Sequence, residues 1–233
     1  MIPLKDDNPT HIRPLVTYGL IAACVLIYLW QASHDARGQQ LVIYALGVIP
    51  ATLLGDASLP EEIAMVPASV TIVTSMFLHG GLWHLGGNML YLWIFGNNVE
   101  DAMGHGRFVA FYLLCGTAAV FAQALPDPES TIPMVGASGA ISGVLGAYLL
   151  LHPHARVLVL IPLGFFSQIV YLPAALVLGL WFVLQLVSQL LTPPGSGGVA
   201  FGAHIGGFIA GMLLIPVFRH RNVRLFSPVR RRR

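Results

Sequence analysis

The sequence predicts an all-α polytopic membrane protein with six transmembrane helices, and its composition and length support this prediction. Of its 233 residues, 56% are hydrophobic and only 9% are charged, and the mean hydropathy is +0.75. A soluble domain carries about 25% charged residues, so this chain has too few charges to cover a water-exposed surface. With about 20 residues per span plus loops, the length fits about six helices. The alternating segments of about 10 residues that are typical of a transmembrane barrel are not seen.

Apolar runs define the six expected spans. They cover residues 14–31, 73–96, 107–125, 138–151, 170–191 and 201–218. Residues 32–70 mix charged residues with apolar pieces, which predicts a folded, membrane-associated loop with short helices. The other connections are the turn 97–106, the loop 126–137, the connector 155–169 and the Pro-, Gly- and Ser-rich loop 192–199.

The basic residues orient the chain, which divides into an N-terminal segment 1–13, a six-helix domain 14–218 and a basic tail 219–233. Six spans place both termini on one side, and 11 of the 12 Lys and Arg residues then fall on that side, with Arg37 alone opposite. The positive-inside rule predicts that this side is the cytoplasm. We expect the arginine-rich tail to bind lipid headgroups, and we expect no nucleic-acid partner for a chain this hydrophobic.

The fourth span is too short to cross a membrane. From Gly139 to Leu151 there are 13 residues, which span about 20 Å against a hydrocarbon core of about 30 Å. The preceding loop must therefore dip into the membrane from the outer side. Irregular backbone at that depth is allowed only where protein buries it or where it lines a wet cavity. The sequence Gly136-Ala137-Ser138-Gly139 thus places Ser138 in a water-accessible pocket.

A histidine inside a span indicates a function, because its burial is costly without a partner or a task. His204 lies on the sixth span. Small residues line one face of that span and one face of the fourth: Ala203, Gly207 and Gly211, and Gly139, Gly143 and Gly146. Such faces let helices pack closely in lipid, which predicts that Ser138 and His204 lie within hydrogen-bond reach. A serine beside a neutral imidazole is an activated nucleophile.

Two polar residues of the second span point to the same chemistry. His84 and Asn88 are four residues apart, so they share one helix face. With the Ser138 backbone N–H, they are candidate donors to an oxyanion. All ten acidic residues map to loops or termini, so the expected arrangement is a dyad and not a triad.

Several alternatives stay open at this point. The Gly136–Gly139 pattern alone is common at tight helix starts, and small-residue faces are often plain packing. His84 and Asn88 can instead form hydrogen bonds between helices. His79, His84 and His204 could suggest a metal site, although no Cys or carboxylate joins them at that depth. A proton or small-molecule transporter is a further alternative, although the chain lacks membrane-embedded carboxylates and obvious internal repeats.

Taken together, these motifs resemble the rhomboid family of intramembrane serine proteases, in its six-helix bacterial form. The resemblance covers nearly the whole chain. It is carried by His84-x-x-x-Asn88, Gly136-Ala137-Ser138-Gly139 and Ala203-His204-x-x-Gly207-x-x-x-Gly211. It implies that Ser138 is the nucleophile and His204 the general base. His84, Asn88 and the Ser138 N–H would stabilise the oxyanion, while Gly136, Ala137 and Gly139 would shape the loop at the substrate site.

The resemblance also implies an activity and a location. We expect a serine endopeptidase that cleaves transmembrane-helix substrates through an acyl-enzyme, needs neither metal nor cofactor, and contacts membrane lipids. The bacterial inner membrane is the expected location, with the site opening outward. A catalytically inactive rhomboid-like protein that binds transmembrane helices is the alternative. The sequence specifies neither the natural substrate nor the oligomeric state.

Three positions deserve comparison with the family pattern. Many bacterial members carry an aromatic residue four positions after the serine, stacked on the histidine, and Ser142 stands there in this chain. Support for His204 must therefore come from elsewhere. The Trp-Arg pair often found in the first outer loop is absent. Glu100 matches an acidic family position at the cytoplasmic end of the second span, and we expect it to be structural.

Overall fold

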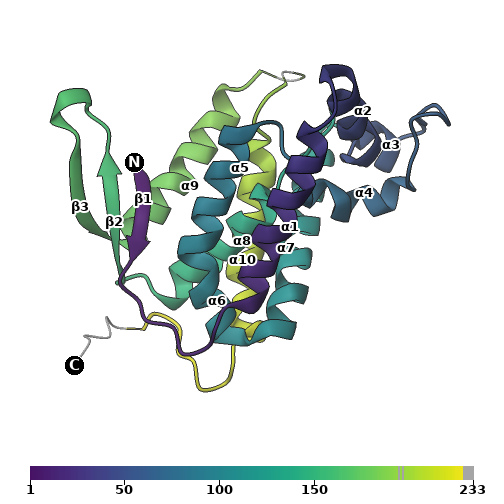
Figure 1. The fold of residues 1–233 in the computed structure, drawn as a ribbon. Helices are drawn as coiled ribbons and strands as arrows, with labels where there is room; N and C mark the ends of the chain where they lie inside the picture. Colours follow the sequence, from purple (N-terminus) through teal and green to yellow (C-terminus); the bar gives the residue numbers. More distant parts are fainter. Residues whose placement is uncertain (194, 196, 228–233) are drawn as a thin grey trace.

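Long apolar helices dominate the computed structural model, which describes residues 1–193, 195 and 197–227. Within these residues, four helices are long and apolar enough to cross a membrane: α1 (Leu15–Ala32), α7 (His105–Ala124), α9 (Ala174–Leu191) and α10 (Phe201–Phe218). The shorter apolar helix α8 (Ser138–Leu151) lies among them (Figure 1). The chain is therefore a mostly helical, multi-pass protein, as the sequence predicts.

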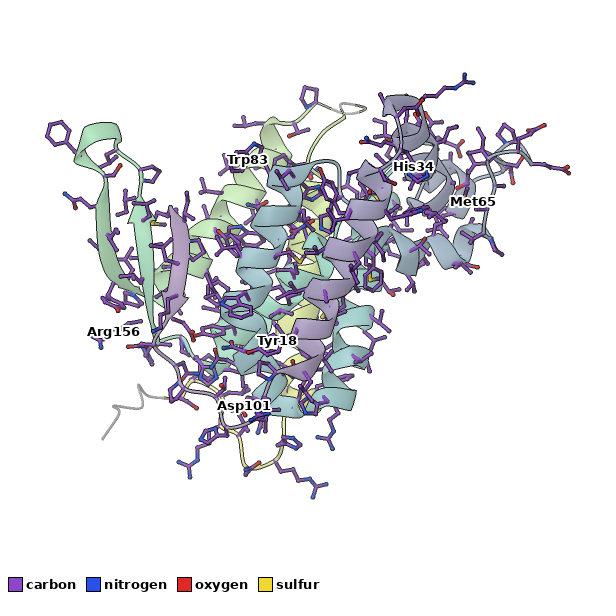
Figure 2. The ribbon with its side chains drawn as sticks, viewed as in Figure 1. Tyr18, His34, Met65, Trp83, Asp101 and Arg156 are labelled. Carbon is purple, nitrogen blue, oxygen red and sulfur yellow. The ribbon has the colours of Figure 1, made fainter. Side chains whose placement is uncertain are left out.

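The second expected span begins and ends later than predicted, since the expected turn 97–106 is helical as far as Met103. The span is a continuous run of three helical pieces: α5 (Leu82–Tyr91), the π-helical turn η2 (Leu92–Gly96) and α6 (Asn97–Met103). The expected start at residue 73 is wrong because the chain leaves its helical path after Phe77 and re-enters a helix only after the glycine pair 80–81. Figure 2 shows Trp83 and Asp101 toward opposite ends of this run.

The short helix α8 is the centre of the bundle. Every residue from Gly139 to Tyr148 is buried, and α7 and α10 pack against it. A Cβ atom added at Gly207 would overlap the carbonyl oxygen of Gly139, and one added at Gly211 would overlap that of Gly143. Glycine is therefore needed for this backbone approach, and the predicted meeting of the two small-residue faces is confirmed.

The segment between the first two long helical runs is folded, as expected. It forms α2 (Ala36–Leu46), α3 (Pro50–Leu53) and α4 (Ala68–Thr74), followed by the 3₁₀ turn η1 (Ser75–Phe77). In Figure 1, α2 and α3 lie together beside one end of the bundle. A β-bridge between Val48 and Met134 joins this segment to the loop that precedes α8.

A small antiparallel sheet makes the fold something other than all-α. It contains β1 (Ile2–Asp6), β2 (Arg156–Ile161) and β3 (Gln168–Pro173) in that order, with the 3₁₀ turn η3 (Gly164–Phe166) between the last two strands. The all-α prediction is wrong here because the strands are short and because Ile2 pairs with Leu160, far away in the sequence. Pairing between strands that are so far apart in the sequence produces no periodic pattern within a short stretch of the chain. In Figure 1 the sheet lies beside α9.

Two neighbouring carboxylates of α6 hold the start of α1. Glu100 is fully buried and accepts hydrogen bonds from the N–H of Val16 (2.9 Å), the N–H of Thr17 (2.8 Å) and the hydroxyl of Thr17 (2.6 Å). His105 Nδ1 lies 2.6 Å from Glu100 Oε1, the same oxygen that accepts from Val16. Asp101 accepts from the backbone N–H groups of residues 11 and 12. The first N–H groups of a helix have no partner within it, so Glu100 satisfies them from outside.

We predict that Glu100→Gln destabilises the protein by about 2–4 kcal/mol. The amide replaces one acceptor oxygen with a donor, which leaves N–H groups of α1 facing another N–H group. Thermal unfolding in detergent measures the effect. The control is Glu62→Gln, at an exposed position between α3 and α4. Equal unfolding temperatures for the two variants would contradict the structural role of Glu100.

The sheet is attached to the bundle through a buried acid. Tyr148 of α8 donates its hydroxyl to Asp6 Oδ2 at 2.7 Å, and Asp6 is only 9% exposed. Burial raises the pKa of Asp6 from 3.8 to about 6, against the opposing effect of the Tyr148 hydrogen bond. The neighbouring Asp7 stays closer to water, where it accepts from Arg156 Nε at 2.9 Å.

The raised pKa predicts a pH-dependent stability. Because folding favours the protonated form of Asp6, its contribution is fully present below about pH 4 and is lost as the pH rises to about 6. At 1.36 kcal/mol per pH unit, the loss is at most about 3 kcal/mol. Asp6→Asn should therefore gain stability over the natural protein between pH 4 and pH 6, measured by thermal unfolding in detergent. Asp56→Asn, at an exposed loop position, is the control. A difference that does not change with pH would contradict the prediction.

Candidate active site

Ser138 and His204 meet at the starts of two helices. Ser138 is the first residue of α8, His204 lies in the first turn of α10, and both are partly buried. Ser138 Oγ lies 2.8 Å from His204 Nε2, which is hydrogen-bond distance. The close approach of α8 and α10 described above sets this distance. The structure therefore brings together the two residues that the sequence analysis singled out.

The rings around His204 come from α9 and α10. Trp181 of α9 lies 5.9 Å from the His204 ring at an angle of 33°, and Phe201 meets the ring edge-on at 6.3 Å. Gln185 Oε1, also on α9, lies 2.8 Å from His204 Nδ1. Trp181, Phe201 and Gln185 thus contact the His204 ring, which an aromatic residue at position 142 would otherwise do. The hydroxyl of Ser142 instead donates to the Ser138 carbonyl at 2.6 Å.

His84 turns a donor toward the same space. Its Nδ1 accepts a hydrogen bond from the N–H of Gly80 at 3.3 Å, so the neutral ring carries its proton on Nε2. Gly136 has a φ of +129°, and a Cβ atom there would lie 2.8 Å from His84 Nε2 and 3.6 Å from Ser138 Oγ. A side chain at position 136 would fill the space between His84 and Ser138, and the glycine keeps it open.

Asn88 offers a second donor from the same helix. It is buried, and its Nδ2 has no hydrogen-bond partner among the residues that the structure describes. Because this N–H donor is not used by the described part of the protein, it is a candidate to bind a ligand oxygen. The N–H of Ser138 is a third donor, since it lies in the first turn of α8 where no partner exists within the helix. The arrangement can therefore stabilise a negative oxygen beside Ser138.

The loop before α8 is held by backbone contacts. Gly136 donates its N–H to the Ser75 carbonyl at 2.8 Å, and Ala137 is fully buried. A Cβ atom at Gly139 would lie 2.6 Å from that of Ala119 on α7. These three small residues thus have packing and conformational roles around Ser138 and donate no side-chain group to it.

His79 contacts the ring of His84. Gln31 of α1 holds its backbone, donating to the His79 carbonyl at 2.8 Å. The His79 ring meets the His84 ring edge-on at 5.2 Å. Within the described residues, no three His, Cys, Asp or Glu side chains gather closely enough to bind a metal ion. The metal alternative for His79, His84 and His204 therefore receives no support from the geometry.

Sequence reasoning missed two glutamines. Gln185 contacts His204, and Gln123 of α7 accepts the N–H of Ala203 at 3.2 Å, which holds the start of α10. The available signal was their position inside apolar spans, where polar side chains are rare and usually have partners. Glutamine in a span can therefore be considered a candidate for a functional contact in the same way as histidine and asparagine.

Fold and site together define a class of protein: an integral, multi-pass helical membrane protein that holds a serine–imidazole pair inside its bundle. Comparison with known families then gives a specific assignment. Residues 67–221, more than half of the chain, match the family model of the Rhomboid domain. This range contains Ser138, His204, His84 and Asn88. The chain belongs to the rhomboid family.

Individual relatives agree with this family. Rhomboid protein 1, mitochondrial, of Saccharomyces cerevisiae is 33% identical over 156 residues, which cover 64% of this chain and 41% of the yeast protein. Rhomboid protease GluP of Bacillus subtilis is 29% identical over 202 residues, covering 87% of this chain and 35% of GluP. The mouse presenilin-associated rhomboid-like protein, mitochondrial, is 28% identical over 162 residues, which cover 64% of this chain and 39% of the mouse protein. The chain thus spans less than half the length of these relatives.

Proposed function

We propose that this protein is an intramembrane serine endopeptidase with a Ser138–His204 dyad. The observation that carries the proposal is the 2.8 Å separation of Ser138 Oγ and His204 Nε2 inside a chain of the rhomboid family. A serine hydroxyl becomes a useful nucleophile when a base lies within hydrogen-bond reach.

The proposed reaction has two stages. His204 Nε2 takes the hydroxyl proton as Ser138 Oγ attacks the scissile carbonyl carbon. The tetrahedral intermediate collapses, His204 gives the proton to the leaving amine, and an acyl-enzyme remains. Water then repeats the sequence, with His204 as its base, and releases the new carboxylate and the free serine.

The negative oxygen of each intermediate needs donors that are already in place. His84 Nε2–H, Asn88 Nδ2 and the Ser138 N–H fit this task. Gly136 keeps the space between His84 and Ser138 open, and Asn88 follows His84 by one turn of α5. Donors fixed in advance lower the barrier without reorganisation during the reaction. The unpaired amide of Asn88 supports the assignment most directly, because it has no structural partner among the described residues.

The proposal includes a placement in the membrane. We count six spans by adding the continuous run α5–η2–α6 and the short α8 to the four long helices. Asp101 and Arg156 lie at one end of the bundle, and His34 lies toward the other (Figure 2). By the positive-inside rule, the first end and both termini are cytoplasmic, and the dyad opens outward. A bacterial inner membrane fits this reading, although the relatives include mitochondrial proteins.

Transmembrane helices are the proposed substrates, and the six-helix domain 14–218 is the proposed protease unit. Helix α9 is the proposed side of entry because it packs on α10 and α8 and exposes large apolar side chains on its other faces. A substrate helix must unwind near its outer end, which small or helix-breaking residues would ease. The loop 192–199 beside α9 is the expected cap, of which residues 194 and 196 lie outside the described part of the chain.

An inactive protein that only binds transmembrane helices is the alternative within the family. The names of the relatives differ on this point, since GluP is named a protease and the mouse relative only a rhomboid-like protein. The intact Ser138–His204 hydrogen bond and the unused donor of Asn88 favour the enzyme. A protein that only binds helices would need neither feature.

A serine-reactive fluorophosphonate tests the proposal. We predict that the detergent-solubilised protein is labelled and cleaves a model transmembrane substrate, and that Ser138→Ala abolishes both. Ser142→Ala, one helical turn further along α8, is the matched control and should still be labelled. Absence of labelling and cleavage in the natural protein, or labelling that persists in Ser138→Ala, would overturn the proposed function.

A further inference from the structure

The side-chain amide of Gln185 makes two contacts that together determine its orientation. Its Nε2 lies 3.3 Å from the backbone carbonyl oxygen of Trp181, one turn earlier on α9. Its Oε1 lies 2.8 Å from His204 Nδ1 on α10. The proposed mechanism does not use this residue, which lies on a different helix from both members of the dyad.

The amide orientation determines which nitrogen of His204 carries the proton. A backbone carbonyl only accepts hydrogen bonds, so the NH₂ group of Gln185 must face Trp181 and the amide oxygen must face His204. An amide oxygen also only accepts, so His204 Nδ1 must carry a hydrogen. In the neutral ring this leaves Nε2 with its lone pair free, and Nε2 is the nitrogen that lies against Ser138 Oγ. Only this tautomer can take the serine proton.

Aromatic packing keeps α9 close enough for this contact. Phe182 stacks on Phe208 of α10 with ring centroids 4.6 Å apart, and Trp181 stacks on the same ring at 5.9 Å. The remaining faces of α9 expose large apolar side chains, including those of Val183, Leu184 and Val187. A hydrogen bond of 2.8 Å weakens steeply when its atoms separate by about 1 Å. The position of α9 relative to α10 therefore controls the contact with His204.

We propose that Gln185 is the positioning residue of the catalytic base: it holds His204 in the tautomer and ring orientation that accept the proton of Ser138. This inference rests on the proposed protease function. It also makes α9 part of the catalytic machinery, because a substrate that displaces α9 would release His204 from Gln185. Catalysis then requires α9 to be packed against α10.

The chemistry explains why an amide suits this position. An ionised carboxylate buried at this depth is costly, and no acidic residue in the described part of α9 or α10 offers one. A neutral amide supplies an acceptor oxygen without that cost. The same group also supplies the donor that fixes its own orientation, which a backbone carbonyl from a neighbouring helix would not.

Kinetics of three variants test the proposal. Gln185→Leu removes the acceptor and should lower kcat for a transmembrane substrate by about 10- to 100-fold with KM unchanged, since misorientation of a catalytic group has effects of this size. Gln185→Glu keeps an acceptor oxygen in either ionisation state and should restore most of the rate. Gln189→Leu, at an exposed position one turn further along α9, is the matched control and should behave like the natural protein.

A spectroscopic measurement reads the tautomer without requiring activity. Nitrogen NMR of ¹⁵N-histidine-labelled protein, with His204→Asn to assign the signal, should show a protonated Nδ1 and a bare Nε2 in the natural protein. In Gln185→Leu the two tautomers should mix. Thermal unfolding of each variant checks that it is folded. If the leucine variant is not folded, Gln185→Met, which also lacks the acceptor, replaces it, with the same expected loss of kcat and the same mixing of tautomers.

The outcomes separate this inference from the proposed function. If the natural protein neither reacts with fluorophosphonate nor cleaves substrate, the protease assignment is overturned. The NMR measurement then still shows whether Gln185 determines the tautomer of His204. An active natural protein with unchanged kcat and an unchanged His204 tautomer in Gln185→Leu overturns the role of Gln185. An equal loss of kcat in Gln185→Leu and Gln189→Leu overturns it as well, because it indicates a general effect on α9.

Discussion

The backbone-to-backbone packing of α8 against α10 is the constraint on which the rest of the structure depends. Helices in lipid gain little from burying apolar surface against each other, so close contact has to come from small residues. Gly207 and Gly211 face carbonyl oxygens of α8 with no room for a Cβ atom. This approach places Ser138 Oγ 2.8 Å from His204 Nε2. Larger residues on either face would move the two helices apart and separate the serine from its base.

Several polar groups inside the bundle have an identified hydrogen-bond partner. Glu100 is occupied by the N–H groups of α1, Asp6 by the hydroxyl of Tyr148, and Ser142 by the Ser138 carbonyl. Gln185 is occupied by Trp181 and His204. Asn88 differs from these, because its amide nitrogen is buried and unpaired among the described residues. Asn88 lies one helical turn after His84 on α5, and the proposed reaction would use its amide as a donor to the developing negative charge.

Much of the arrangement could be predicted from the sequence, and the limits have physical reasons. The short α8, the glycine faces and the Ser138–His204 pairing follow from local patterns and from the cost of burying polar groups in lipid. The β1–β2 pairing joins residues about 150 positions apart, which no local pattern encodes. The start of α5 depends on a glycine pair that breaks an otherwise continuous apolar run. Gln185 was missed because its role appears only when the packing of α9 on α10 is known.

The most direct test of the account is an experimental structure of the protein after reaction with a fluorophosphonate. We expect a phosphorus atom bonded to Ser138 Oγ, with the phosphoryl oxygen within hydrogen-bond distance of Asn88 Nδ2 and His84 Nε2. His204 should stay hydrogen-bonded to Gln185 Oε1 through Nδ1. A phosphoryl oxygen that points away from Asn88 and His84, or an adduct on a residue other than Ser138, would contradict the account.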